Sequence, residues 1–213
     1  RNYPNGVYKD QCRGQEFREQ SKIITDKIVG ELLRDFGDSD KAKIVVALPW
    51  RAGLAFVSSF REAGITKFYH FDIQRDEKTA KPIFATENGD VSDDSIVIIA
   101  DPMLATGGSA ITAINKLQSK GVLKNNIIMM SVVSAPVGVA KILSFGARVI
   151  TAFLHKKLDN KAYIVPGLGD YGDKYFDEMS EEELKRFIIE IVGLSLEEET
   201  GQKLLSRFVR HFA

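Results

Sequence analysis

The stretch that decides the fold class is Ile96-Val-Ile-Ile-Ala-Asp101-Pro-Met-Leu-Ala-Thr106-Gly-Gly-Ser109-Ala-Ile-Thr. Residues 96–100 are apolar and mostly β-branched, as in a strand buried on both faces, and an acidic residue ends that run. A turn of small residues follows and opens a helical pattern over residues 108–119. A strand that passes through a tight turn into a helix is the repeating unit of a parallel α/β sheet.

The turn after this strand has the composition of a phosphate site. Gly107 and Gly108 let backbone amides approach an anion with no Cβ in the way, while Thr106 and Ser109 add hydroxyl donors. The positive end of the helix dipole lies at the same place. Asp101, at the carboxyl end of the strand, can accept hydrogen bonds from both ribose hydroxyls. The pattern therefore predicts a ribose 5-phosphate site, and a plain strand-to-helix turn with Asp101 as a cap is the alternative.

The rest of the chain supports the α/β interpretation. Apolar runs at residues 44–48, 68–73, 127–133 and 149–154 alternate with helical patterns near residues 54–63 and 137–144. This alternation predicts buried parallel strands joined by crossover helices. Ahead of the first strand, apolar residues near helical spacing predict a helix over residues 15–36.

Two segments depart from this alternation. Residues 76–94 contain Asn88-Gly89, a strong hairpin signal, so we expect a β-arm or flap that projects from the sheet. Residues 177–213 contain the capping box Ser180-Glu-Glu-Glu183 and two amphipathic helical patterns. We therefore expect a domain of residues 1–176 and a helical extension of residues 177–213, docked on that domain or on a partner subunit.

The composition excludes several classes of protein. The 213 residues suffice for one domain with a sizeable core, and 29 Lys and Arg balance 29 Asp and Glu, so no basic face points to nucleic acid. Cys12 is the only cysteine, which excludes an internal disulfide and fits a reducing compartment. No apolar run approaches the ~20 residues that span a bilayer. No signal-peptide pattern appears, although the native start is left open because the chain begins at Arg1. The histidines lack metal-ligand spacing and are expected to be structural or exposed: His70, His155 and His211.

Two strings resemble known motifs. Asp101-Pro-Met-Leu-Ala-Thr-Gly-Gly-Ser-Ala110 resembles the loop that binds phosphoribosyl pyrophosphate (PRPP) in uracil phosphoribosyltransferases, a branch of the type I phosphoribosyltransferase fold. Tyr163-Ile-Val-Pro-Gly-Leu-Gly-Asp-Tyr-Gly-Asp-Lys174 resembles that family's uracil-binding segment. The resemblance covers about residues 44–176. It implies a central parallel sheet flanked by helices with a small hood or flap, and transfer of ribose 5-phosphate from PRPP to N1 of uracil, which gives UMP and diphosphate in pyrimidine salvage.

The same resemblance implies the residues of the site. Those expected to bind PRPP are Arg51, Arg75, Asp101, Pro102, Met103, Leu104, Ala105, Thr106, Gly107, Gly108, Ser109 and Asp170. Those expected to bind uracil are Ile164, Gly169, Asp170 and Tyr171, and those expected to be catalytic are Arg51, Arg75, Asp101 and Asp170. The arginines would stabilise the charge that develops on the leaving diphosphate. Uracil would be read by backbone amides and carbonyls, since Gly and Pro can shape the chain closely around it.

The resemblance also implies cofactors and partners. Mg²⁺ is expected to enter with PRPP, held by the diphosphate and water, because Pro102 stands where many relatives of the wider fold have a second acid. Asp173 is the candidate for a contact through water. A cytoplasmic homo-oligomer, dimer or tetramer, is expected, with no nucleic acid or membrane partner and with GTP activation left open. The alternatives are a phosphoribosyltransferase for another base, a nucleotide-sensing regulator of the same fold without catalysis, and a catalytically silent subunit.

Overall fold

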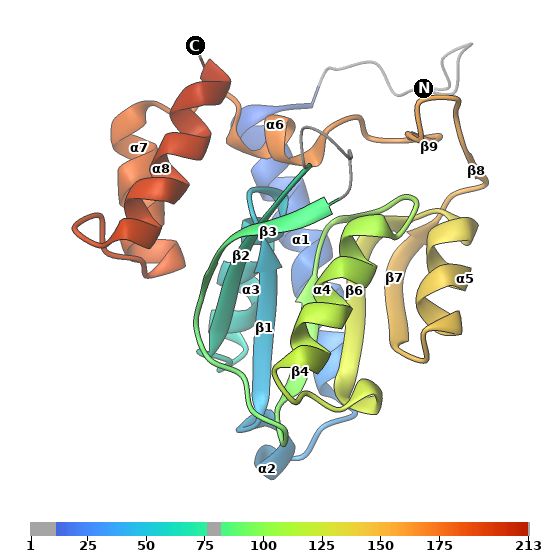
Figure 1. The fold of residues 1–213 in the computed structure, drawn as a ribbon. Helices are drawn as coiled ribbons and strands as arrows, with labels where there is room; N and C mark the ends of the chain where they lie inside the picture. Colours follow the sequence, from blue (N-terminus) through green and yellow to red (C-terminus); the bar gives the residue numbers. More distant parts are fainter. Residues whose placement is uncertain (1–11, 76–81, 213) are drawn as a thin grey trace.

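The computed structural model describes residues 12–75 and 82–212, without the side chains of residues 75, 82, 83 and 209–212. Its main sheet has seven strands in the order β3-β2-β1-β4-β6-β5, with β7 paired to β6 (Figure 1). The strands are β1 (Ile44–Pro49), β2 (Phe68–Arg75), β3 (Pro82–Asn88), β4 (Ile96–Ala100), β5 (Met103–Leu104), β6 (Ile127–Ser134) and β7 (Arg148–Leu154). All the strand pairs are parallel except β2 with β3. The predicted parallel α/β architecture is thus confirmed.

Helices cover both faces of this sheet. On the main body these are α1 (Gly14–Leu33), α2 (Asp38–Lys41), η1 (Ala52–Phe56), α3 (Val57–Glu62), α4 (Gly108–Ser119), η2 (Lys124–Asn126) and α5 (Pro136–Ser144). A hood follows, made of β8 (Lys157–Leu158), β9 (Ile164–Val165) and α6 (Tyr171–Phe176), and the chain ends in α7 (Glu181–Arg186), η3 (Phe187–Val192) and α8 (Glu199–Phe212). The predicted helix over residues 108–119 coincides with α4.

The central strands alternate between two hydrophobic clusters, one on each face of the sheet. Val46 and Ile98 belong to the cluster that includes apolar residues of α1 and α3. Val45 and Ile99 belong to the cluster formed with α4 and α5. Because successive strand residues point to opposite faces, an unbroken apolar run is what a sheet covered on both sides requires. The strand at residues 149–154 differs from the prediction: β7 lies at the edge of the sheet and is half-buried to exposed.

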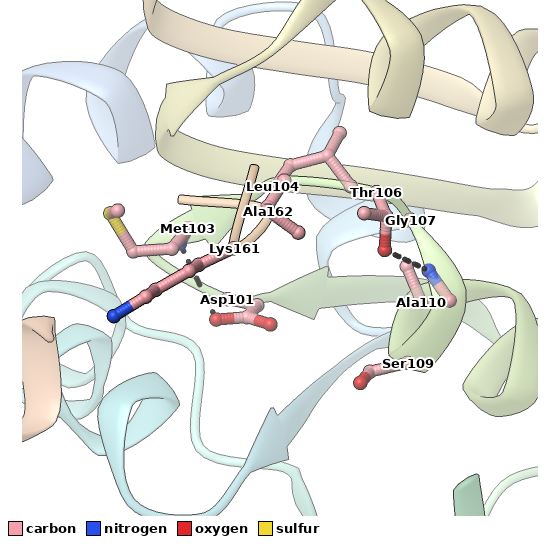
Figure 2. Close-up of a pocket in the computed structure, with 11 residues that line it drawn as sticks. Asp101, Met103, Leu104, Thr106, Gly107, Ser109, Ala110, Lys161 and Ala162 are labelled. Carbon is pink, nitrogen blue, oxygen red and sulfur yellow. Dashed lines mark hydrogen bonds between the residues drawn. The ribbon is translucent and has the colours of Figure 1, made fainter. Parts of the chain in front are cut away.

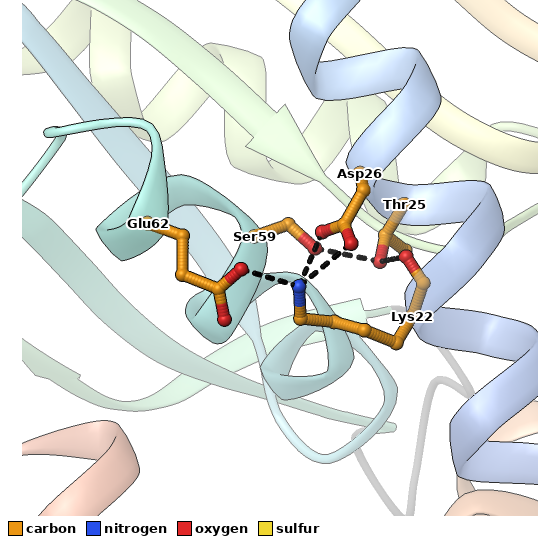
Figure 3. A network of polar contacts seen from close by, with 5 residues as sticks. All are labelled: Lys22, Thr25, Asp26, Ser59 and Glu62. Carbon is orange, nitrogen blue, oxygen red and sulfur yellow. Dashed lines mark hydrogen bonds and ion pairs between the residues drawn. The ribbon is translucent and has the colours of Figure 1, made fainter.

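Helix α1 is joined to α3 by a polar network (Figure 3). The Lys22 amino group lies 2.6 Å from Asp26 and 2.7 Å from Glu62, and these side chains are solvent-accessible. Beneath them, the hydroxyls of Thr25 and Ser59 form a buried hydrogen bond of 2.7 Å. Exposed ion pairs contribute about 0–1 kcal/mol. The buried hydroxyl pair and the surrounding apolar contacts therefore fix the position of α1.

The expected hairpin at Asn88-Gly89 is wrong. Strand β3 pairs with β2, with Asn88 opposite His70, and β4 pairs with β1 instead of with β3. The segment after Asn88 is therefore a connection that carries the chain away from the sheet edge. Gly89 is required there for another reason: its φ is +107°, and a Cβ would lie 2.4 Å from the carbonyl oxygen of Phe68. Of the predicted flap, residues 82–88 form an edge strand of the main sheet, and residues 76–81 lie outside the described residues.

The helical extension is docked on the body. Ser180 and Glu183 form the predicted capping box at the start of α7. Phe187 and Phe208 pack edge-on against Phe176 of the hood, with ring centroids 5.4 and 4.6 Å apart. Within residues 12–75 and 82–212, no helix is long and apolar enough to cross a bilayer.

Candidate functional site

The glycine turn between β4 and α4 forms an open cavity at the carboxyl edge of the sheet (Figure 2). Gly107 has a φ of +74° and is the N-cap of α4, a backbone conformation that favours glycine. The Thr106 hydroxyl accepts a hydrogen bond of 3.5 Å from the amide of Gly108. The cavity has a volume of about 250 Å³ and is lined by Asp101, residues 103–110, Lys161 and Ala162. Hydroxyls and the amino end of a helix converge here, as a phosphate group requires.

The first turn of α5 supports this loop from behind. Gly138 packs so closely against it that a Cβ would lie 2.4 Å from the carbonyl oxygen of Ala105. The same Cβ would lie 3.1 Å from the Leu104 side chain. Only glycine allows this approach without displacement of backbone. Sequence reasoning missed Gly138, because a glycine within a helical pattern does not indicate what packs against it.

Asp101 is a carboxylate in an unfavourable environment. Burial raises the pKa of Asp101 to about 6, because desolvation penalises the charged form. The amide of Met103, 3.4 Å from Oδ1, opposes the rise in this pKa, and the negative charge of Asp170 adds to it. Two acids from segments far apart in the sequence therefore share one electrostatic environment. Ribose hydroxyls or a cation at this position would stabilise the charged form of Asp101.

The base segment is shaped by close backbone contacts. Gly167 lies so near β9 that a Cβ would be 2.0 Å from the carbonyl oxygen of Ile164. Gly169 has a φ of +75°, and the peptide bond before Pro166 is cis. Asp170 then caps α6, where its Oδ1 accepts a hydrogen bond of 2.9 Å from the amide of Asp173. The segment thus exposes backbone groups in a fixed arrangement beside the cavity.

The side chain of Tyr171 points away from this segment and into the core. Its hydroxyl forms a buried hydrogen bond of 2.5 Å with Ser21 of α1. Its ring packs edge-on against Phe17, with centroids 4.9 Å apart. Burial raises the pKa of Tyr171 above its usual value. Tyr171 can therefore contribute backbone atoms to a base pocket, while its side chain anchors α6 to α1.

Arg51 follows β1 and reaches the same edge of the sheet. Its Nη2 donates a hydrogen bond of 2.7 Å to Oδ1 of Asp173. Its other terminal nitrogen, Nη1, is buried and has no hydrogen-bond partner among the described residues. A buried guanidinium nitrogen without an acceptor fits an anionic ligand. Trp50 is buried in the core. Arg75 ends β2, and its side chain is outside the described part.

Sequence reasoning missed Lys161 and Ala162, which line the cavity from the loop between β8 and β9. Oδ1 of Asp159 holds that loop by accepting hydrogen bonds from the amides of Lys161 and Tyr163, at 2.8 and 2.9 Å. Ala162 has a φ of +64°, a left-handed conformation that residues with a Cβ rarely adopt. The Asp159-Asn160 pair was the available signal for a turn, but it does not say that the turn faces the cavity.

Other titratable groups lie apart from the cavity. Burial lowers the pKa of His70 to about 4, with a further contribution from the nearby charge of Arg61. Burial also lowers the pKa of His155 and raises that of the Cys12 thiol. The side chain of His211 is outside the described residues. Across residues 12–75 and 82–212, no cluster of three or more His, Cys, Asp or Glu could hold a metal ion.

Relatives of known name cover most of the chain. The family model described as "Uracil phosphoribosyltransferase" matches residues 30–177. The uracil phosphoribosyltransferase of Pediococcus pentosaceus is 36% identical over 186 residues, which cover 78% of this chain and 88% of that protein. The enzyme of the same name from Lactiplantibacillus plantarum is 35% identical over 191 residues, which cover 80% and 90%.

Solved structures agree on the fold. A protein from Aquifex aeolicus superposes with a TM-score of 0.67 at 26% identity, covering 77% of this chain and 87% of that one. The APRTase of Giardia lamblia, solved with 9-deazaadenine, has a TM-score of 0.52 at 18% identity over 64% and 81% of the two chains. At that identity the likeness concerns the fold alone, which is the type I phosphoribosyltransferase fold implied by the sequence motifs.

Proposed function

Because the chain belongs to the uracil phosphoribosyltransferase family, we propose that it transfers ribose 5-phosphate from PRPP to N1 of uracil, giving UMP and diphosphate. One observation carries the proposal: the glycine turn with Asp101 and the loop that leads into the base segment, with Lys161 and Ala162, line one cavity at the edge of the sheet. A nucleotide has its phosphate, ribose and base in that order. The two segments offer matching groups in the same order.

The phosphate and ribose of PRPP bind at the β4–α4 turn. The 5-phosphate accepts hydrogen bonds from the turn amides and from the hydroxyls of Thr106 and Ser109, both exposed to the cavity. Asp101 accepts from the ribose hydroxyls. Pro102 and residues 103–105 shape the passage from strand to turn, and Asp170, whose charge acts on Asp101, reaches the ribose from the base segment. These hydrogen bonds hold C1 of the ribose in front of the base segment.

The two arginines act on the leaving diphosphate. Arg51 has one terminal nitrogen without an acceptor among the described residues, and this nitrogen donates to a diphosphate oxygen. Arg75 acts from the end of the neighbouring strand β2. As the bond to C1 breaks, charge accumulates on the diphosphate, so donors held in place lower the barrier. Mg²⁺ entering with PRPP would add further charge neutralisation there. No cluster of ligands in the described part of the chain could hold it directly, so the diphosphate and water would hold it, with Asp173 as the candidate for a contact through water.

Uracil is recognised by backbone groups of the base segment, with Ile164, Gly169 and the backbone of Tyr171 around it. Its two carbonyls and the N3 hydrogen pair with amides and carbonyls that Gly167 and Pro166 fix in place. Nucleophilic attack by N1 forms the new bond to C1 while the bond to diphosphate breaks, and the N1 proton passes to solvent or to the diphosphate.

We also propose a homo-oligomer, a dimer or tetramer, that works in the cytoplasm on pyrimidine salvage. The edge strand β7 and α1 offer an apolar face for a second copy, with Ile23, Phe153 and Leu154 about half exposed. An exposed apolar patch beside an unpaired strand edge is typical of an interface. The catalytic unit is residues 1–176, and activation by GTP stays a prediction, checked by adding GTP to the assay.

The test is a base panel. The protein is incubated with PRPP and Mg²⁺ together with uracil, cytosine, hypoxanthine or orotate, and nucleotide and diphosphate are measured. UMP from uracil alone supports the proposal. Product from another base keeps the transfer chemistry and contradicts the assignment of the base segment, whereas PRPP binding without product from any base favours the regulator or the silent subunit.

A further inference from the structure

Helix α8 is tied to strand β2 by an ion pair in which Asp72 is buried and Arg207 is partly exposed. Nη2 of Arg207 donates a hydrogen bond of 3.2 Å to Oδ1 of Asp72, and Nε of Arg207 lies 3.2 Å from Oδ2. The side chain of Gln74 donates to the same Oδ2 at 2.7 Å. Asp72 is only 2% exposed. A carboxylate buried to this degree depends on its partners, so loss of Arg207 would leave an uncompensated charge inside the protein.

The contact belongs to a docked face of α8. Thr200 and Arg207 lie on the same side of α8, since seven residues span about two turns, and Phe208 follows about 100° further around the helix. Thr200 accepts a hydrogen bond of 3.4 Å from the Asn88 side chain at the end of β3. Phe208 is fully buried and packs against Phe176. The helix therefore holds three separate elements of the body at once, namely β2, β3 and α6.

Asp72 lies close to the backbone of both arginines of the site. The residue before it, Phe71, accepts a hydrogen bond of 2.9 Å from the amide of Trp50, and Arg51 follows directly. Three residues beyond Asp72, Arg75 ends the strand. The register between β2 and β3 shifts immediately after Asp72, so the regular ladder is interrupted at this point. The contact with α8 therefore meets β2 at the point where its ladder with β3 is irregular, before the pairing resumes at Ile73.

We propose that Arg207 is a positioning residue of the transferase site: through Asp72 it fixes the end of β2 that supports Arg51 and carries Arg75. The inference rests on the proposed function, because it takes the diphosphate contacts of the two arginines as given. The family model ends at residue 177. The extension therefore adds, from outside the matched region, a support for the PRPP half of the site.

The experiment compares steady-state kinetics of the wild type, Arg207→Ala, Arg207→Lys and Lys203→Ala. Lys203 is the matched control, since it lies about one turn away on α8 and forms an ion pair of 2.5 Å with Glu199 of the same helix. We expect Arg207→Ala to lower kcat/KM for PRPP about tenfold, with KM for uracil changed less than twofold. Arg207→Lys should recover part of the loss, and Lys203→Ala should match the wild type. Thermal unfolding of each variant is recorded alongside.

The outcomes separate the possibilities. If Arg207→Ala lowers the melting temperature but leaves the PRPP parameters within twofold, the extension is merely structural and the inference is wrong. Equal losses toward PRPP and uracil would contradict it as well. If Arg207→Ala is unfolded at the assay temperature, the kinetics of Asp72→Asn are measured and judged by the same criteria. This substitution keeps the shape of the side chain and removes its charge. A wild type that makes no UMP contradicts the proposed function and this inference together.

Discussion

The two halves of the site are built in different ways. The phosphate half is local: β4, the glycine turn and the start of α4 form one continuous stretch, and Gly107 and Thr106 are held by contacts within it. The base half is held from far away. Tyr171 is fixed by Ser21 of α1, 150 positions earlier in the chain, and α6 packs against Phe208 in the last helix.

This difference predicts which substitutions should impair each half of the site. A turn built from local backbone geometry depends on the residues within it and on the one helix packed behind it. A segment held by distant aromatic contacts depends on the core of the whole domain. Changes at the turn should therefore reduce PRPP binding and leave stability nearly intact, whereas changes behind the base segment should reduce stability before they reduce uracil binding.

The largest effect is expected for Asp101→Asn. Loss of the carboxylate removes charge-assisted hydrogen bonds to the ribose, and we expect kcat/KM for PRPP to fall about 100-fold, or ~2.7 kcal/mol. The melting temperature should rise, because the folded pKa of about 6 exceeds the unfolded value of 3.8, so the charged form is penalised in the folded protein at neutral pH. Kinetics and thermal unfolding of the same preparation test the expected fall in kcat/KM and the expected rise in melting temperature. Unchanged kinetics would contradict the role of Asp101.

A matched pair of glycine variants separates the two halves. Gly138→Ala pushes on Ala105 behind the turn, and Gly167→Ala pushes on Ile164 beside the base segment, each through a Cβ under 3 Å from a backbone oxygen. We expect the first to raise KM for PRPP and the second to raise KM for uracil, each about 30-fold, or ~2 kcal/mol. Measurement of both constants for both variants is the check. If both variants raised the same KM value, or raised both KM values equally, the two halves of the site would not be independent.

The pH dependence should belong to the phosphate half. The pKa of Asp101 in the free protein is about 6, so the carboxylate needed for ribose is lost as pH falls through that value. Below pH 6 we expect kcat/KM for PRPP to fall about tenfold per pH unit. The profile of Asp101→Asn serves as the control for ionisation of PRPP itself. If kcat/KM for PRPP falls by the same factor at the same pH in the wild type and in Asp101→Asn, then Asp101 is not the titrating group.

Tyr171→Phe tests the base half through stability. Removal of the hydroxyl leaves Ser21 without its buried partner, at a cost of about 1–2 kcal/mol in the free energy of unfolding. KM for uracil should stay within twofold, because the side chain points to α1. Denaturant unfolding of Tyr171→Phe, Ser21→Ala and the double variant measures the coupling between them. A large rise in KM for uracil with unchanged stability would show that the side chain lines the base pocket after all.

The smallest effect is expected at the rim, for Ala162→Gly. Ala162 has a φ of +64°, where glycine avoids a penalty of roughly 1–2 kcal/mol but loses more backbone entropy on folding. The net gain in the free energy of unfolding should be about 0.5 kcal/mol, measured by denaturant titration. Ala105→Gly, within the turn, offers no such relief and should not stabilise. A destabilised Ala162→Gly would mean that the loop is not strained.

Much of the fold could be predicted from the sequence because its signals are local. The run from Ile96 to Ala100, the turn and α4 all lie where the pattern predicts them, as does the capping box at Ser180. The hairpin predicted at Asn88-Gly89 was wrong, because a turn signal specifies the shape of the turn and does not specify which strand the next strand pairs with. Strand β3 pairs with β2, which precedes it in the chain, and β4 pairs with β1.

The site could be predicted as two motifs but not as one surface. The approach of Asp170 to Asp101, and of Lys161 to the turn, depends on how the hood folds back over the sheet, which no local pattern specifies. Gly138 is hidden for the same reason. The orientation of Tyr171 could not be predicted either, since an aromatic residue in a glycine-rich segment fits a pocket wall as well as a core.

The most direct test of the central claim, that the two halves form one nucleotide site, is a calorimetric titration of the wild type with UMP followed by competition with PRPP. UMP carries the phosphate, the ribose and the base on one molecule. We predict binding of one UMP per chain, displaced by PRPP and weakened by both Asp101→Asn and Gly167→Ala. Binding of UMP that PRPP does not displace, or that survives both substitutions, would contradict the account.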